Sequence, residues 1–93
     1  MEKLKVENLE FDALKIDMYG SALMIIKGSK GFLACGYINV ETAEKLSHAC
    51  AIVRGVKNFG DMMAAKVCAV SASARALGVE EGISGAEALK ILH

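Results

Sequence analysis

The hydrophobic pattern of the chain changes its period near residue 39, and this change limits the possible folds more than any other feature. Before it, apolar and polar residues alternate, as they do from Leu14 to Met18, which is typical of half-buried antiparallel strands. After it, Ala43, Leu46 and Cys50 recur at helical spacing and mark one face of a helix. Strands followed by helices in one chain predict the α+β class.

The segment Gly28–Asn39 links the two halves of the chain. Its first four residues, Gly28–Gly31, predict a hairpin turn, because glycine adopts the backbone angles that such turns require. We expect the chain to return as a strand over Phe32–Ile38, and Asn39 is a suitable N-cap for a helix. The preceding run Ala22–Ile26 is apolar on both faces, which predicts a strand that is central in the sheet or covered by another subunit.

The second half of the chain carries the signals of three helices and one further strand. The first helix is expected over Val40–Ala49, and the apolar residues within 51–56 predict a buried strand that rejoins the sheet after a helical crossover. A second helix is expected to begin after Asn58 and to run to Leu77, with Gly78 as its left-handed terminator. Ser84 and Glu87 have the spacing of a capping box, so a last helix should run from there to about Leu92.

We therefore predict a two-layer α+β sandwich. Its mostly antiparallel sheet contains an N-terminal β meander and one later strand, and its helices pack on one face. A length of 93 residues without proline or a linker predicts a single domain over residues 1–93. Within it, residues 1–38 form a β-rich oligomerisation region and residues 39–93 are mainly helical.

Composition indicates self-association and argues against two classes of partner. Of the residues, 54% are hydrophobic, and the mean hydropathy is +0.37. A monomer of this size does not easily bury so much apolar surface, so we expect a homo-oligomer. Eleven basic residues balance eleven acidic ones, so nucleic acid is not an expected partner. No long apolar segment or signal peptide is apparent, and the cysteines are three, an odd number. These features predict a cytoplasmic protein without membrane contact.

Cys35 is the one candidate for a reactive residue, because Gly36 beside it leaves room for a ligand to approach the thiol. A reactive thiolate needs a nearby cation or helix N-terminus, and Arg54 and Lys57 are the candidate cations. The alternative is structural packing, since free cysteine is among the most buried residue types. Arg54, Gly55 and Lys57 also suggest a corner that binds a small anion, or else charges at the surface.

The spacing of His and Cys residues does not predict a metal site. His48 and Cys50 are two residues apart, and Cys35 and Cys68 lie in separate elements, so no usual ligand spacing occurs. We expect neither a metal nor a cofactor. The segment Gly82–Gly85 is compatible with an anion site at a helix start, but Glu87 would compete for the same amides, which favours plain capping.

Six motifs run through most of the chain: Gly31–Asn39, Gly55–Lys57, Asp61–Met63, Ala74, Ala76–Val79 and Gly82–Leu89. Together they resemble the YunC-like family of uncharacterised bacterial and archaeal proteins. The resemblance implies a compact α+β domain whose N-terminal β region mediates tetramer formation, and it implies no known reaction. Asn39 and Asn58 stand where the family pattern has Asp and Thr; both remain N-caps, which favours a structural role for these positions.

Three functions remain open from the sequence. The first is a homo-oligomeric domain of unknown function, suspected to be a tetramer, that self-associates through its N-terminal strands. The second is a small-molecule-binding protein or a thiol-dependent enzyme around Cys35, in which Gly36, Arg54, Gly55 and Lys57 bind a small anionic ligand. The third is an adaptor that binds another protein through a residual apolar patch. The sequence leaves open whether the protein is an enzyme.

Overall fold

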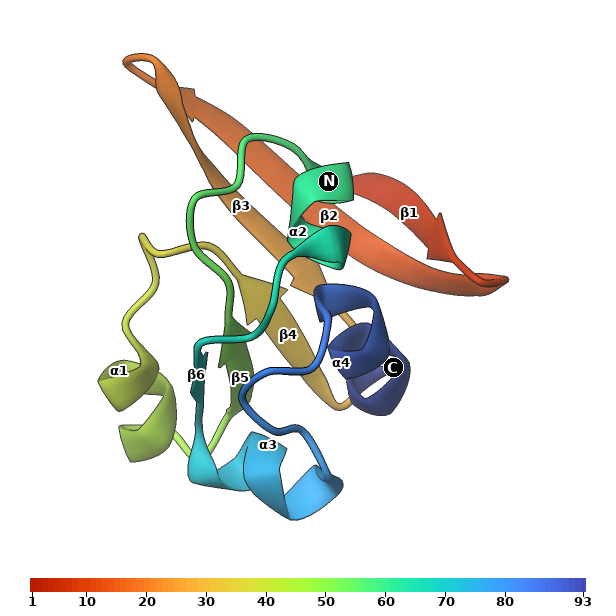
Figure 1. Ribbon diagram of the computed structural model, residues 1–93, viewed down its shortest axis with the longest axis vertical. Coiled ribbons are helices and arrows are strands. Elements are labelled where there is room, and N and C mark those ends of the chain that lie inside the picture. Colours follow the sequence, from red (N-terminus) through yellow and green to blue (C-terminus); the bar gives the residue numbers. More distant parts are fainter.

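The computed structural model describes residues 1–93, which form one six-stranded sheet and four helices (Figure 1). The strands follow one another in the sheet in sequence order, and all neighbours are antiparallel except β4 and β5. The mixed α+β class and the mostly antiparallel sheet are therefore confirmed. The strands are β1 (Glu2–Val6), β2 (Leu9–Met18), β3 (Ser21–Lys27), β4 (Gly31–Ala34), β5 (Ala49–Ile52) and β6 (Ala69–Val70). The helices are α1 (Val40–Lys45), α2 (Phe59–Ala64), α3 (Ala72–Leu77) and α4 (Gly85–Leu92).

The long hairpin of β2 and β3 dominates the N-terminal region and its tip projects from the body (Figure 1). Its register pairs Asp12 with Lys27 at one end and Met18 with Ser21 at the other. The two tip residues have positive φ angles, 48° at Tyr19 and 92° at Gly20, which is the geometry of a two-residue hairpin turn that follows the strand twist. The turn predicted at Gly28–Gly31 is also present, closed by Gly28 N donating to Gly31 O.

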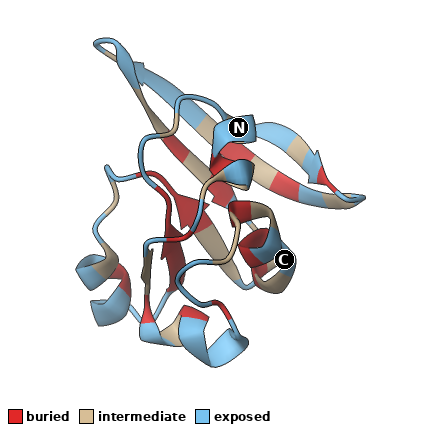
Figure 2. Ribbon diagram, viewed as in Figure 1, coloured by how far each residue is buried: buried red, intermediate tan, exposed pale blue.

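The sheet carries helices on both faces rather than on one. Successive residues of β5 alternate between two apolar clusters, because side chains along a strand point to opposite faces. Ala49 and Ala51 join the larger cluster, to which α2, α3 and α4 contribute, whereas Cys50 and Ile52 join a smaller one with Ala43 of α1. The expectation of helices on one face therefore fails for α1, which crosses from β4 to β5 on the opposite face. Figure 2 shows the buried residues concentrated on β4, β5 and the adjoining half of the hairpin.

The first helix is shorter than the sequence suggests. It ends at Lys45, and Ser47 has a φ of 58° that turns the chain into β5. Helical spacing predicts Cys50 on the apolar face of this helix, but Cys50 belongs to a strand whose four residues are all buried. A strand buried on both faces is a continuous apolar run without alternation, so hydrophobic spacing alone does not separate it from the end of a helix.

The single helix expected from residue 59 to Leu77 is divided in two. Helix α2 ends at Ala64, the chain then runs extended through β6, and α3 begins after Ser71. The fully buried Ser71 hydroxyl explains the break: it accepts from the amides of Ala74 and Cys50 and donates to the carbonyl of His48. It thus caps α3 and joins it to β5. The strand expected over 32–38 also stops early, at Ala34, where Ile38 N donates to Cys35 O in a turn.

The predicted helix caps are confirmed. Asn39 accepts from the amide of Glu41, and Asn58 accepts from the amide of Asp61. Ser84 and Glu87 form the complete capping box, and Gly78 ends α3 in the left-handed conformation with a φ of 108°. Each cap satisfies backbone groups that a helix end leaves unpaired.

Helix α4 starts in close contact with α2. A Cβ atom placed on Gly85 would lie only 1.9 Å from the carbonyl oxygen of Met62 and 3.0 Å from Cδ2 of Leu33. The amide of Gly85 in turn donates to the carbonyl of Ala65. The absence of a side chain at Gly85 therefore sets how closely the two helices approach.

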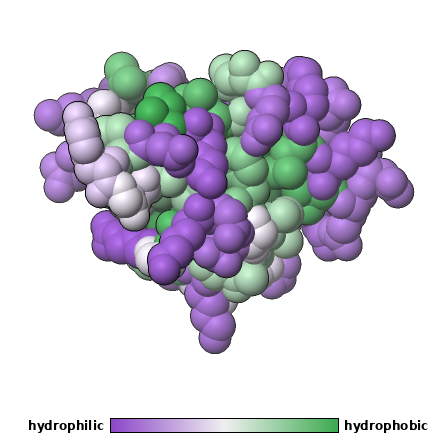
Figure 3. All heavy atoms as spheres, turned by 90° about the horizontal axis from the view of Figure 1, so that it is seen from above, coloured by the Kyte–Doolittle hydropathy of each residue, from purple (hydrophilic) through white to green (hydrophobic).

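Hydrophobic residues reach the surface in several places among the charged ones, as the view from above shows (Figure 3). None of the helices is long and apolar enough to cross a membrane.

Candidate functional site

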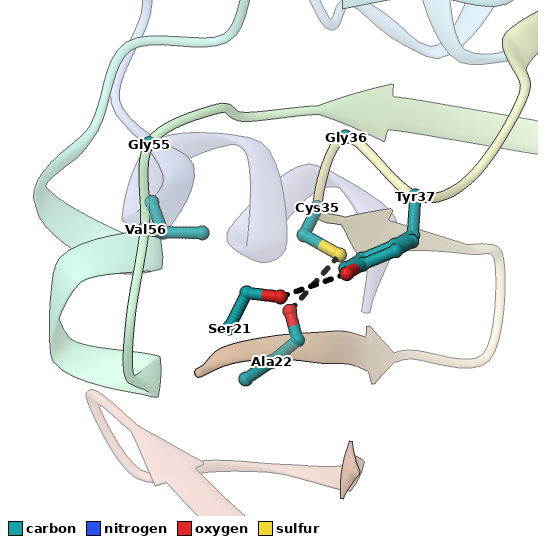
Figure 4. A pocket seen from close by; sticks show the side chains of 7 residues that line it. All are labelled: Ser21, Ala22, Cys35, Gly36, Tyr37, Gly55 and Val56. Atoms are coloured by element: carbon teal, nitrogen blue, oxygen red, sulfur yellow. Dashed lines mark hydrogen bonds between the residues drawn. The ribbon is translucent and has the colours of Figure 1, made fainter. Parts of the chain in front are cut away.

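A hollow of about 340 Å³ opens where the parallel strands β4 and β5 end (Figure 4). The two loops that leave these carboxyl ends, together with the start of β3, supply its walls. In sheets with parallel strands, ligands bind preferentially outside the carboxyl ends, where successive loops diverge. The lining residues are Ser21, Ala22, Cys35, Gly36, Tyr37, Gly55 and Val56.

Cys35 lies one residue beyond β4, and its thiol completes the pairing of β3 with β4. The amide of Cys35 donates to the carbonyl of Met24 at 3.1 Å. The Met24 amide does not bond the Cys35 carbonyl in return but donates to Sγ at 3.3 Å. The thiol faces the carbonyl of Ala22 at 3.8 Å. Cys35 is 4% exposed, so the sulfur is a fixed part of the wall of the hollow.

Tyr37 and Ser21 form a hydroxyl pair at the rim of the hollow (Figure 4). Their oxygens lie 2.8 Å apart, and Ser21 also donates to the carbonyl of Met18 at 2.8 Å. A serine hydroxyl carries one proton, so the Tyr37 hydroxyl is the donor between the two. Tyr37 remains 53% exposed, and its ring and hydroxyl are available to a bound molecule.

The candidate residues from the sequence gather around this hollow, although they do not all line it. Gly36 and Gly55 are in its wall. The Arg54 side chain lies over Gly36, since a Cβ placed there would be 3.5 Å from Arg54 Cγ and 3.6 Å from Nε. Lys57 lines an adjoining hollow of about 290 Å³ with Lys15 and Asp17, and the two hollows share Ser21 and Ala22.

Sequence reasoning missed Ser21, Tyr37 and Val56. Ser21 belongs to the hairpin and Val56 to the loop after β5, so only the folded sheet brings them to the thiol. Of the three, Tyr37 alone has a local signal, because it lies two residues after Cys35, within the strand predicted over Phe32–Ile38.

The arrangement supports binding more directly than catalysis. A catalytic thiol needs a general base within hydrogen-bond reach, and the residues that line this hollow include no His, Asp or Glu. They offer instead two hydroxyls, a thiol and apolar contacts from Ala22 and Val56. Cys50 lies in the core, and burial raises the pKa of its thiol to about 11, which keeps it protonated. No three His, Cys, Asp or Glu side chains lie close enough to hold a metal together.

Comparison with known proteins identifies the family. Residues 34–92 match the family described as Domain of unknown function (DUF1805). The chain belongs to this family. It is also similar to a protein of unknown function from Thermoplasma acidophilum whose crystal structure is known. The two are 33% identical over 99% of this chain and 90% of that one, with a TM-score of 0.92. No curated protein matches the chain.

The two comparisons cover different sets of the residues that line the hollow. The family match includes Cys35, Gly36, Tyr37, Gly55 and Val56, but it begins after Ser21 and Ala22. The Thermoplasma structure covers nearly the whole chain and therefore includes the β2–β3 hairpin as well. Both comparisons are with proteins of unknown function, and neither assigns an activity.

Proposed function

We propose that this domain functions as a homo-oligomer that self-associates through its N-terminal β region. The observation that carries the proposal is an apolar face on the β2–β3 hairpin, on the side opposite the larger core. Ile16 pairs with Leu23, and Leu14 with Ile25. None of the residues of this hairpin face is fully buried, and Ile16 is 45% exposed. The hairpin face consists of Leu14, Ile16, Met18, Leu23 and Ile25.

A second copy of the chain is the partner that fits the hairpin face best. The charges of β2 in this stretch, Lys15 and Asp17, point to the opposite side, because side chains alternate along a strand. The hairpin face is thus uncharged along its length, and apolar surface of this kind favours contact over exposure to water. A two-fold axis would bring two identical faces together, as in most homo-oligomers.

The resemblance to the YunC-like family supports the same proposal. That resemblance implies that the N-terminal β region mediates tetramer formation, so we expect an assembly of four copies. The three free cysteines fit a reducing cytoplasm as the compartment.

The experiment compares two substitutions of adjacent residues on β2 by light scattering coupled to size exclusion. The wild type should have a mass that is a multiple of 9.8 kDa, and Ile16→Glu should shift it towards the single chain because it places a charge in the hairpin face. Lys15→Glu, on the opposite side of the same strand, is the control and should keep the assembly. A wild type that elutes as a single chain, or an Ile16→Glu variant with unchanged mass, would sink the proposal.

A second candidate function is the binding of a small molecule in the hollow beside Cys35. The convergence of Cys35, Gly36 and Gly55 in one wall, with Arg54 and Lys57 close by, favours it. A ligand would place an uncharged part against Val56 and Tyr37 and an anionic group towards Lys57 and Lys15.

Alkylation by iodoacetamide tests access to the thiol in the folded protein. In a Cys68→Ser background, which removes the exposed cysteine, mass spectrometry should find Cys35 modified while Cys50 stays unmodified. A further Cys35→Ser substitution should abolish the modification. Equal protection of Cys35 and Cys50 would show that the thiol is inaccessible and would rule out this site as a place for thiol chemistry.

A further inference from the structure

A separate hollow of about 240 Å³ lies at the other end of the β4–β5 pair, where both strands begin. Two segments far apart in sequence form it: the β3–β4 turn and the loop between α1 and β5. The parallel pairing of Gly31 with Ala49 brings them together. The lining residues are Lys27, Gly28, Ser29, Lys30, Gly31, Phe32, Ser47, His48 and Ala49.

The polar side chains of this hollow are hydrogen-bond donors. Lys27 and Lys30 carry positive charges, Ser47 has a hydroxyl, and His48 has a ring N–H in either tautomer. No Asp or Glu is among the lining residues. Two carboxylates lie beyond the lining, on β2: Asp12, which is opposite Lys27 in the sheet and is bonded to Lys3, and Glu10. Both line an adjoining hollow that shares Lys27, Gly28 and Ser29 with this one. The hollow therefore presents donors and positive charge to a bound molecule.

The backbone of both walls is held in place. The turn is fixed by the amides of Ser29 and Lys30, which donate to the carbonyls of His93 and Leu92 at the end of α4. On the other side, the His48 amide donates to the Ala43 carbonyl at 2.9 Å, and the His48 carbonyl accepts from buried Ser71 at 2.8 Å. A site whose walls are fixed before binding loses less entropy when a ligand arrives.

We propose that this hollow binds a small phosphate-bearing molecule. Lysine ammonium groups, together with hydroxyl and imidazole donors, bind phosphate oxygens through charge-assisted hydrogen bonds. Phe32, which is half-buried in the same wall, supplies an apolar contact for the organic part of a phosphate monoester. This site shares no lining residue with the hollow at Cys35 and does not depend on self-association.

The test is a titration followed by amide NMR with two probes, inorganic phosphate and phenyl phosphate, each at constant ionic strength. Saturable shifts are expected in the amides of residues 28–31 and 47–49. The Lys27→Gln/Lys30→Gln variant should bind about tenfold more weakly, the loss expected when charge-assisted contacts worth about 1.4 kcal/mol disappear. Lys45→Gln/Lys66→Gln removes the same charge elsewhere and should bind like the wild type.

Three results would overturn the proposal. Shifts that increase linearly with phosphate would show that only general charge effects occur. An equal loss in both double variants would show that the net charge, and not this hollow, attracts the anion. Phenyl phosphate that binds no more tightly than inorganic phosphate would overturn the part assigned to Phe32. Light scattering on both variants separates these outcomes from any change of assembly.

Discussion

Gly85→Ala should destabilise the fold strongly, although alanine is a better helix former than glycine. The new Cβ would lie 1.9 Å from the Met62 carbonyl oxygen, about 1.4 Å short of the usual contact of a carbon with an oxygen. The obstacle is backbone, so α2 and α4 must move apart. Overpacking of this kind costs about 1–3 kcal/mol and occasionally more, whereas alanine gains back about 0.5–1 kcal/mol. Because the obstacle is backbone and the overlap is severe, the upper end of that cost applies, and we expect a net loss of about 2 kcal/mol.

Urea denaturation at a fixed protein concentration measures this loss, and thermal unfolding should show a midpoint lowered by about 10 °C for a domain of this size. Gly36→Ala is the matched control. Its Cβ would meet Arg54 Cγ at 3.5 Å, an ordinary contact, and Gly36 has no positive φ, so its stability should stay within about 0.5 kcal/mol of the wild type. The reasoning is refuted if Gly85→Ala unfolds at the wild-type midpoint or if the two variants lose stability equally.

Three further predictions concern polar and titratable groups. Ser71→Ala should cost about 2–3 kcal/mol in urea denaturation, because it leaves the buried Cys50 amide unpaired, whereas Ser73→Ala on the same helix should be nearly neutral. Burial raises the pKa of the Cys50 thiol from 9.0 to about 11. Between pH 9 and 11 the unfolded chain has lost this proton while the folded chain keeps it, so the free energy of unfolding should fall over this range. The Cys50→Ala variant should lack this part of the fall. The hydrogen bond from Lys3 lowers the pKa of Asp12 below 3.8, so Lys3→Met should lose less stability than the wild type as the pH falls below 4.

Local chemistry made much of the fold predictable. The caps at Asn39, Asn58 and Ser84 and the terminator Gly78 depend on residues within a few positions of one another, and so does the turn at Gly28–Gly31. The break at Ser71 was not predictable in this way. Its hydroxyl bonds groups that lie 21 and 23 residues earlier in the chain, and hydrophobic spacing contains no trace of such contacts.

Local sequence signals do not report contacts between distant residues, and this explains which parts of the sites could not be predicted. Cys35 and Gly36 are adjacent in sequence, so their combination was visible before the structure. The basic hollow was not, because Lys27, Lys30 and His48 are single residues in two segments that only the β4–β5 pairing brings together. Arg54 and Lys57 are outside the lining of the hollow at Cys35: the Arg54 side chain lies over Gly36, and Lys57 lines the adjoining hollow.

The thiol of Cys35 makes the length of the β3–β4 ladder depend on a side chain. Along most of the sheet the main chain supplies the acceptors, so most substitutions leave the pairing intact; the Cys50 amide, which donates to the Ser71 hydroxyl, is a second exception. At position 35 the acceptor for the Met24 amide is the sulfur. Serine could keep that acceptor, whereas alanine would leave a buried amide unpaired. Only a short side chain with a lone pair suits this position, which restricts its chemical variation even if the thiol never reacts.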